Sequence, residues 1–234
     1  METVAVALYL PDRPDIHILA NFCVFKNDHG ASRAALTPMH ESRPPGAVIE
    51  VFAKESSWEE QYASQEAANP PSHRYCSDNA YISNTLPQHK PSGSSNEDQV
   101  SVSSVLEKAF LTLPTRKSCA LYFSMYPTSR RPLPPMALSM QSDHYFALYA
   151  VWEDEKDDER VRGWVRDTMK GVERHADGSY LGDADFRIRG SRFWGAEEWQ
   201  KIEEVRKRWD PKGKVSGYLD QGRGMRNEHD WVSW

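Results

Sequence analysis

The amino-acid sequence predicts an α+β fold: an antiparallel β-sheet with helices packed on one face, plus a C-terminal helix. Predicted strands outnumber long helices, their connections are mostly short, and 234 residues suffice to bury one large core. We therefore expect a single domain over residues 1–216, with a sheet-and-helix core in 1–176 and a C-terminal segment in 177–216. Residues 217–234 are rich in Gly, Asp, Asn and Arg, which predicts a weakly ordered tail.

The strands of the sheet are predicted from runs of β-branched and aromatic residues bounded by turn residues. The first two runs are separated by the turn sequence PDRPD and therefore predict a hairpin. The predicted strands cover residues 3–10, 16–26, 47–54, 73–82, 118–127 and 143–152.

Helices are predicted where apolar residues recur at three- and four-residue intervals behind a serine or acidic start. The clearest covers residues 157–178, and the others lie in 31–39, 56–67 and 102–114. The C-terminal helix lies in 193–215, where an Asp-Pro pair ends it. Its apolar stripe consists of Trp199, Ile202, Val205 and Trp209. Such a stripe needs a surface on which to lie.

Composition excludes several functional classes. A formal net charge of -5 and the lack of a basic stripe interleaved with aromatic residues argue against a nucleic-acid partner. No apolar run approaches the roughly 20 residues that a membrane helix needs. The N-terminus lacks a basic segment of the signal-peptide type, and three widely spaced cysteines indicate neither a disulfide framework nor a zinc site. We therefore expect a cytoplasmic protein with no metal and no membrane attachment.

Alternation along two strands predicts one aliphatic and one tyrosine-rich face of the sheet. We expect the aliphatic face, which helices would cover, to carry Leu121, Phe123, Met125, Phe146, Leu148 and Ala150. We expect the other face to carry Tyr122, Ser124, Tyr126, Tyr145, Ala147 and Tyr149. A half-polar, tyrosine-rich surface suits binding of a flat organic molecule, and it equally suits a solvent-facing surface or a subunit interface.

The C-terminal segment resembles a signature of berberine bridge enzyme-like flavin oxidoreductases. The sequence GSYLGDADF, followed by RFWGAEEWQKIEEVRKRWDPKGKV, is similar to the family's closing motifs. The matched positions are Tyr180, Asp185, Phe193, Trp194, Gly195, Ile202, Val205, Trp209, Asp210 and Pro211. Upstream segments are similar in order and spacing to the family's substrate domain. The resemblance therefore covers most of residues 1–216 and implies a substrate-type domain.

The resemblance also implies what this sequence lacks. In that family an N-terminal flavin domain precedes this region, whereas this sequence starts at Met1 within the substrate domain and has no Gly-rich phosphate loop. Gly182 and Asp183 stand where the family pattern has Asn and Tyr. We therefore expect no bound cofactor. The helix in 193–215 is interpreted as an element that once returned to a flavin domain and now packs on this domain or on a second copy.

Two hypotheses of function follow. The first is a flavin-independent, non-redox enzyme of specialised metabolism that catalyses a cyclisation, isomerisation or pericyclic reaction on a polyketide- or terpenoid-like substrate. Its candidate catalytic residues are Tyr122, Tyr126, Tyr149, His144, Asp143 and Asp183, and its candidate substrate-binding residues are Tyr75, Ser124, Tyr145 and Tyr180. The second is a non-catalytic binding subunit, or half of a split flavin oxidase, that docks on a separate FAD-domain protein.

The partners expected are a small organic molecule and a second copy of the chain. Loss of a flavin domain would expose the tyrosine-rich face, and monomeric proteins rarely expose apolar patches beyond a few hundred Å². We therefore expect a homodimer that forms through that face. Alternatively, a bound small molecule or a separate flavoprotein covers the face.

Overall fold

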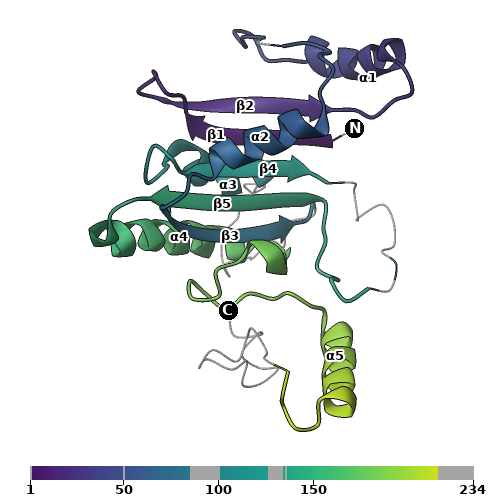
Figure 1. The fold of residues 1–234 in the computed structure, drawn as a ribbon, viewed down its shortest axis with the longest axis vertical. Coiled ribbons are helices and arrows are strands. Elements are labelled where there is room, and N and C mark those ends of the chain that lie inside the picture. The colour runs from purple at the N-terminus through teal and green to yellow at the C-terminus, as the bar shows by residue number, and fades with distance from the viewer. Residues whose placement is uncertain (1, 50, 85–100, 126–133, 135, 216–234) are drawn as a thin grey trace, which may run out of the picture.

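A six-stranded antiparallel sheet forms the centre of the molecule, which confirms the predicted fold class. The computed structural model describes residues 2–215 except 50, 85–100, 126–133 and 135. The strands are β1 (Glu2–Tyr9), β2 (Ile16–Cys23), β3 (Arg74–Ile82), β4 (Cys119–Ser124), β5 (His144–Trp152) and β6 (Ala176–Gly178). Across the sheet they run in the order β2-β1-β4-β5-β3-β6, and every described pairing is antiparallel (Figure 1).

Helices α3 and α4 cover one face of this sheet and enclose the main core. The helices are α1 (His29–Glu41), α2 (Trp58–Ala68), α3 (Val102–Leu111), α4 (Asp158–Glu173) and α5 (Ala196–Trp209), with short 3₁₀ turns η2 (Glu155–Asp157) and η3 (Leu181–Asp183). Helix α3 begins at a capping box on Ser101. The fully buried core side chains from this layer and the sheet include Phe146, Leu148, Val161, Val165 and Met169.

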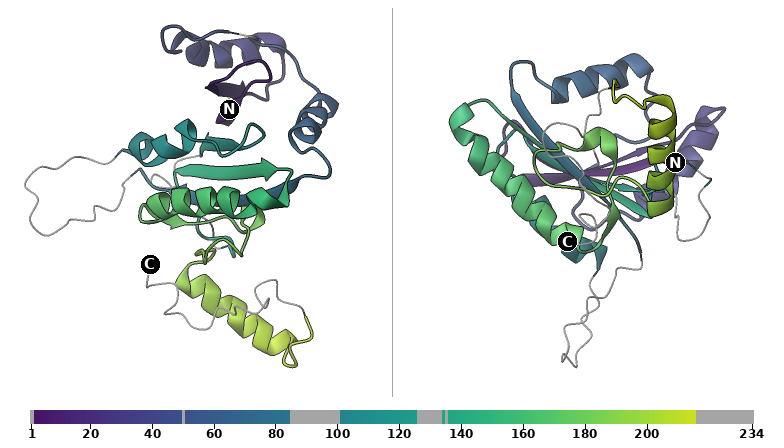
Figure 2. Two further views of the ribbon diagram at one scale, coloured as in Figure 1. Left: turned by 90° about the vertical axis from the view of Figure 1, so that its left-hand side faces the viewer. Right: turned by 90° about the horizontal axis from the view of Figure 1, so that it is seen from below.

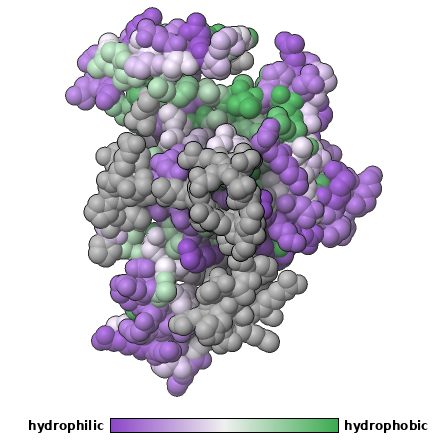
Figure 3. All heavy atoms as spheres, turned by 180° about the vertical axis from the view of Figure 1, so that it is seen from behind, coloured by the Kyte–Doolittle hydropathy of each residue, from purple (hydrophilic) through white to green (hydrophobic). Residues whose placement is uncertain are grey.

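The β1–β2 end of the sheet is less covered than its centre. The predicted hairpin is present with eight continuous residue pairs, but the edge strand β2 leaves Ile18 58% exposed. Helix α2 lies on the opposite side of the sheet from α3 (Figure 2). Seen from behind, hydrophobic residues gather in the upper half of the molecule, the part that holds β1 and β2 (Figure 3).

The predicted strand at 47–54 is wrong. Its described residues form neither a strand nor a helix, and the Val48 side chain is 86% exposed. Ala53 adopts a positive φ of 54°, which an extended strand does not accommodate. Local β-branched composition is thus insufficient here, because a strand also needs a neighbour that accepts its backbone hydrogen bonds.

Helix α5 forms where predicted but stands apart from the sheet (Figure 1). None of its residues is fully buried, and the stripe residues Val205 and Trp209 are 57% and 73% exposed. At its start, the ring of Trp199 contacts the ring of Trp194 in a tilted arrangement, with centroids 5.2 Å apart. The described residues therefore cover only part of the apolar stripe of α5. Among the described helices, none is long and apolar enough to cross a bilayer.

Candidate functional site

The two central tyrosines of β5 lie on the face of the sheet opposite α3 and α4. Tyr145 and Ala147 are buried there, with half-buried Tyr149, Leu121 and Phe123 packed beside them. This face is therefore tyrosine-bearing, as the alternation of β5 predicts. It also carries aliphatic and aromatic residues of β4 that we expected on the other face.

The prediction of which β4 residues share a face with the β5 tyrosines is wrong, because the register between β4 and β5 differs from the one we assumed. Tyr122 pairs directly with Phe146, and Ser124 pairs with His144, so these four residues share the face that α3 and α4 cover. Opposed residues of an antiparallel pair project to the same side of a sheet. Alternation fixes the sides within one strand, but only the register relates the sides of two strands.

Asp183 is the polar centre of the tyrosine-bearing face. The hydroxyls of Tyr145 and Tyr149 both donate to its Oδ2 atom, over 2.5 Å and 2.9 Å. The carboxylate is half-buried at the end of η3, and the two tyrosines come from the adjacent central strand. Residues from distant parts of the chain thus form a hydrogen-bonded group of one acid and two phenols.

Two further tyrosines complete what we call the Asp183 cluster, defined as Asp183, Tyr81, Tyr145, Tyr149 and Tyr180. The rings of Tyr81 and Tyr145 lie 5.3 Å apart, and Tyr180 meets Tyr145 edge to face at 6.5 Å. The Tyr180 side chain also lies over Gly182, where an added Cβ would come within 2.8 Å of the ring. A side chain at position 182 would therefore require the Tyr180 ring to move from this place.

Burial raises the pKa of three phenols of this cluster. Burial first, and then the nearby Asp183 carboxylate, raise the pKa of Tyr149, and burial with the Asp183 hydrogen bond raises that of Tyr145. Burial raises the pKa of Tyr81 to about 12. At neutral pH these hydroxyls are donors. The hydrogen bonds that Tyr145 and Tyr149 donate to Asp183 both reach Oδ2, so Oδ1 is the oxygen that can act as a base.

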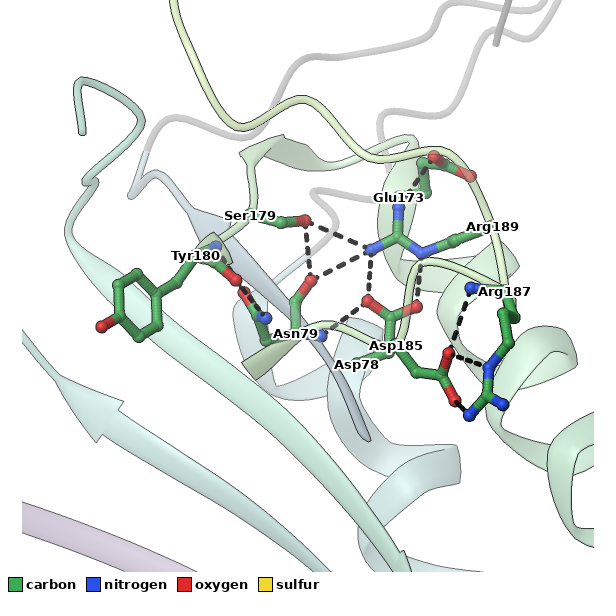
Figure 4. A network of polar contacts seen from close by, with 8 residues as sticks. All are labelled: Asp78, Asn79, Glu173, Ser179, Tyr180, Asp185, Arg187 and Arg189. Atoms are coloured by element: carbon green, nitrogen blue, oxygen red, sulfur yellow. Dashed lines mark hydrogen bonds and ion pairs between the residues drawn. The ribbon is translucent and has the colours of Figure 1, made fainter. Parts of the chain in front are cut away.

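A buried polar network fixes the segment that carries Tyr180 and Asp183 (Figure 4). The side-chain amide of Asn79 donates to the Tyr180 carbonyl over 2.8 Å and accepts from the Tyr180 N–H over 2.6 Å. Arg189 forms an ion pair with Asp78 at 2.6 Å and another with Glu173 of α4 at 2.9 Å. The network joins β3, α4 and residues 177–189, so it sets where Asp183 lies relative to β5.

Sequence reasoning missed Asn79, Asp78, Arg189 and Tyr81. Asp78 and Asn79 are 1% and 0% exposed in β3, where the other buried residues are Cys76, Ala80, Tyr81 and Ile82. A buried polar pair in a strand requires partners, and that requirement is the signal that could have identified them.

The His144 side chain belongs to a second polar group, on the helix-covered face. The Tyr122 hydroxyl donates to His144 Nδ1 over 2.7 Å, and His144 Nε2 donates to the Asn84 amide oxygen over 2.7 Å. Burial raises the pKa of Tyr122. The predicted residues Tyr122 and His144 are thus joined to each other and separated from Asp183 by the sheet.

Stability should depend on the protonation of His144. Burial lowers its pKa below the ordinary 6.5, although the Asp143 carboxylate opposes this. Because the unfolded state then binds more protons, the contribution of His144 is complete above pH 6.5 and is lost as the pH falls toward the folded-state pKa. We expect His144→Gln to flatten the pH dependence of the urea midpoint in this window. An unchanged profile in the variant would contradict the assignment.

The remaining predicted site residues lie elsewhere. The Asp143 side chain is 1% exposed and accepts the Asn84 N–H over 2.8 Å, which is a structural contact. Tyr75 pairs with Val151 on the same face as Tyr149, and its hydroxyl donates to the Pro70 carbonyl. Tyr126 lies outside the described residues.

The starts of the described helices do not fit the diphosphate of a flavin dinucleotide. An anion cradle needs free backbone N–H groups at a helix start. Helices α1, α2 and α3 are capped by their own Asp28, Ser57 and Ser101 side chains, and α4 and α5 carry acidic residues in their first turns. These helix starts are therefore satisfied internally or repel an anion.

Comparisons with known proteins relate the chain to flavin enzymes over part of their length. It is 27% identical over 228 residues to the FAD-linked oxidoreductase penO of Penicillium crustosum, covering 97% of this chain and 48% of penO. It is 28% identical over 215 residues to the FAD-linked oxidoreductase ptmO of Penicillium ochrochloron, covering 92% and 45%. The chain therefore spans about half the length of the curated relatives it matches. It matches no family model.

A solved structure shows the same fold. CrmK, a flavoenzyme involved in the shunt product recycling mechanism in caerulomycin biosynthesis, superposes with a TM-score of 0.59 at 12% identity, covering 93% of this chain and 46% of CrmK. The antiparallel-sheet fold of this chain is therefore also found as part of a flavoenzyme. More particularly, the chain is similar to FAD-linked oxidoreductases over one part of their length, which agrees with the flavin-oxidoreductase resemblance that its C-terminal motif indicates.

Proposed function

We propose that this protein binds a small organic metabolite at the Asp183 cluster and catalyses a non-redox isomerisation or cyclisation there by proton transfer. The observation that carries the proposal is the half-buried Asp183 carboxylate, held by the hydroxyls of Tyr145 and Tyr149 at 2.5 Å and 2.9 Å. An acid and two phenols fixed on rigid elements provide a positioned base and positioned donors without further groups.

The proposed reaction uses each group in a defined role. The Asp183 carboxylate removes a proton from a carbon next to a carbonyl or an equivalent activating group of the substrate. As Asp183 takes up that proton, the Tyr149 hydroxyl turns away from Asp183 and donates its hydrogen bond to the substrate oxygen on which negative charge develops. The Asp183 proton then returns to another carbon, so that substrate and product have the same composition. The aromatic surface of Tyr180 and Phe123 orients the substrate and removes activation entropy.

A second candidate function is the substrate-binding part of an FAD-linked oxidoreductase. The alignment that covers 97% of this chain but 48% of penO favours it. Because the described helix starts do not fit a diphosphate, the flavin would be held by polypeptide outside the described residues. In this case too, Asp183 and Tyr149 would bind and orient the substrate.

The mass of the substrate separates the two functions. We would replace the native gene with an Asp183→Asn allele in the source organism and compare the metabolites by mass spectrometry. Under the non-redox proposal the metabolite that accumulates is an isomer of the product that disappears. An accumulated compound with two more hydrogen atoms than the lost product would overturn it in favour of the oxidoreductase. Unchanged metabolites would remove Asp183 from either reaction.

We also propose that a second copy of the chain covers the sheet face that bears the Asp183 cluster. Half-buried Leu121 and Phe123 lie on this face and leave apolar surface for such a contact. Light scattering of the purified protein should then give twice the chain mass of 26.8 kDa. A single chain mass would leave a ligand or another polypeptide to cover the face.

A further inference from the structure

The charge of Asp183 is not balanced by any cation among the described residues. The nearby arginines are engaged elsewhere. Arg189 pairs with Asp78 and Glu173, Arg187 pairs with Asp185 at 2.8 Å, and Arg192 donates to the Asp177 carbonyl. The only hydrogen bonds to Asp183 in the described part of the chain come from phenols. A half-buried carboxylate in this situation favours a positively charged partner.

The surroundings of this carboxylate favour a large, weakly hydrated cation. Tyrosine rings attract cations at their faces, and the cluster contains four of them, at positions 81, 145, 149 and 180. Tyr149 is half-buried and Tyr180 is 37% exposed, so both can contact a ligand. Within the described residues no group of three or more His, Cys, Asp or Glu is placed to hold a metal ion. An organic cation therefore fits the site better than a metal ion.

We propose that the Asp183 cluster binds the positively charged nitrogen of an organic ligand, a protonated tertiary amine or a quaternary ammonium group. The inference rests on the proposed function, because it names the substrate class of the same site. Asp183 forms the ion pair, and the rings of Tyr149 and Tyr180 contact the carbons attached to the nitrogen. Gly182 contributes by leaving room for the Tyr180 ring.

A positively charged substrate also suits the proposed proton transfer. In a cationic substrate that also carries a β,γ-unsaturated ketone, a C–H bond next to the carbonyl loses its proton to Asp183 and leaves a neutral carboxylic acid and a dienolate. The ammonium group of the same substrate offsets the negative charge of the dienolate. Return of that proton to the far carbon of the dienolate regenerates the carboxylate and gives an isomeric enone, so atoms and charge balance without an oxidant.

The test uses two ligands of the same shape that differ in charge. The full chain is titrated with (4-hydroxyphenyl)trimethylammonium and with 4-tert-butylphenol, and the dissociation constants are measured by NMR. We expect the cation to bind about tenfold or more tightly than its neutral counterpart, the range of a desolvated cation–π and ion-pair contact. Equal affinities of the two ligands would overturn the proposal.

Variants test whether the preference for the cationic ligand arises at the Asp183 cluster. Asp183→Asn should bring the ratio of affinities close to one, whereas the exposed control Asp167→Asn on α4 should keep it. Tyr180→Leu keeps the charge and removes a ring, so it should reduce the ratio even if Asp183→Asn folds poorly. A ratio that survives both Asp183→Asn and Tyr180→Leu would place cation binding elsewhere and overturn the proposal.

Failure of this inference is distinguishable from failure of the proposed function. If the Asp183→Asn allele stops product formation but the two ligands bind equally, the proton transfer stands and the cationic substrate class is wrong. If the ligands bind as expected and the allele leaves the metabolites unchanged, the cluster is a cation-binding site and the catalytic proposal is wrong.

Discussion

Replacing Arg189 with alanine is expected to lower the free energy of unfolding by about 3–5 kcal/mol, the cost of removing one partner from a buried ion pair. The side chains of Arg189 and Asp78 are 10% and 2% exposed, and their closest atoms lie 2.6 Å apart. Arg189 also pairs with Glu173 and donates to the Asn79 carbonyl. Its loss leaves two carboxylates and a carbonyl without this donor.

The position of Asp78 explains the size of the effect. Burial raises the pKa of Asp78, and the charge of Arg189 opposes that rise. Without the arginine, the carboxyl group must either stay charged inside the protein or take up a proton at neutral pH. Either outcome destabilises the folded state relative to the unfolded state, where water solvates the group.

Urea unfolding followed by circular dichroism measures this effect. The matched control is Arg166→Ala, which removes the exposed ion pair between Arg166 and Glu159 at 2.9 Å on α4. An exposed pair of this kind contributes about 0–1 kcal/mol. Similar losses in the two variants would show that the Arg189 network does not stabilise the fold as its burial indicates.

Asp183→Asn is expected to reduce turnover of the natural substrate by about 10²–10⁴-fold, the range for loss of a positioned general base. The asparagine keeps the shape of the side chain and an oxygen that can accept the Tyr145 and Tyr149 hydroxyls. Folding should therefore be preserved while the proton acceptor is lost. Tyr149→Phe removes a donor and leaves the base, so we expect a smaller loss of about tenfold.

The measurement is the rate of product formation from the metabolite that accumulates in the Asp183→Asn strain, assayed with each purified variant. Asp167→Asn makes the same chemical change on an exposed position of α4 and should retain the wild-type rate. Near wild-type turnover by Asp183→Asn, with an intact circular dichroism spectrum, would rule out Asp183 as the base.

Local patterns in the sequence were sufficient for most elements of the fold. The period of α4 and the acidic start of that helix predict its position, and the alternation of β5 predicts which of its residues share a side. The segment at 47–54 has the composition of a strand yet lacks a place in the sheet. Propensity describes what a segment can adopt, whereas pairing depends on residues far along the chain.

The candidate site was only partly predictable. Tyr145, Tyr149, Tyr180 and Asp183 are predicted site residues that the fold brings together. Tyr122 and Ser124 fall on the opposite side because Tyr122 pairs with Phe146, and a shift of one residue in that register would reverse the outcome. Neither the sequence of β4 nor that of β5 alone determines this register.

The sequence by itself determined the period of each helix and strand and the family resemblance in the C-terminal motif. These follow from neighbours along the chain, whose spacing is fixed by the geometry of the backbone. Only the tertiary structure decided the register of β4 against β5, the partner of Arg189, and the exposure of the α5 stripe. Each of these depends on contacts between distant segments, because burial and charge pairing are settled only when the whole domain packs.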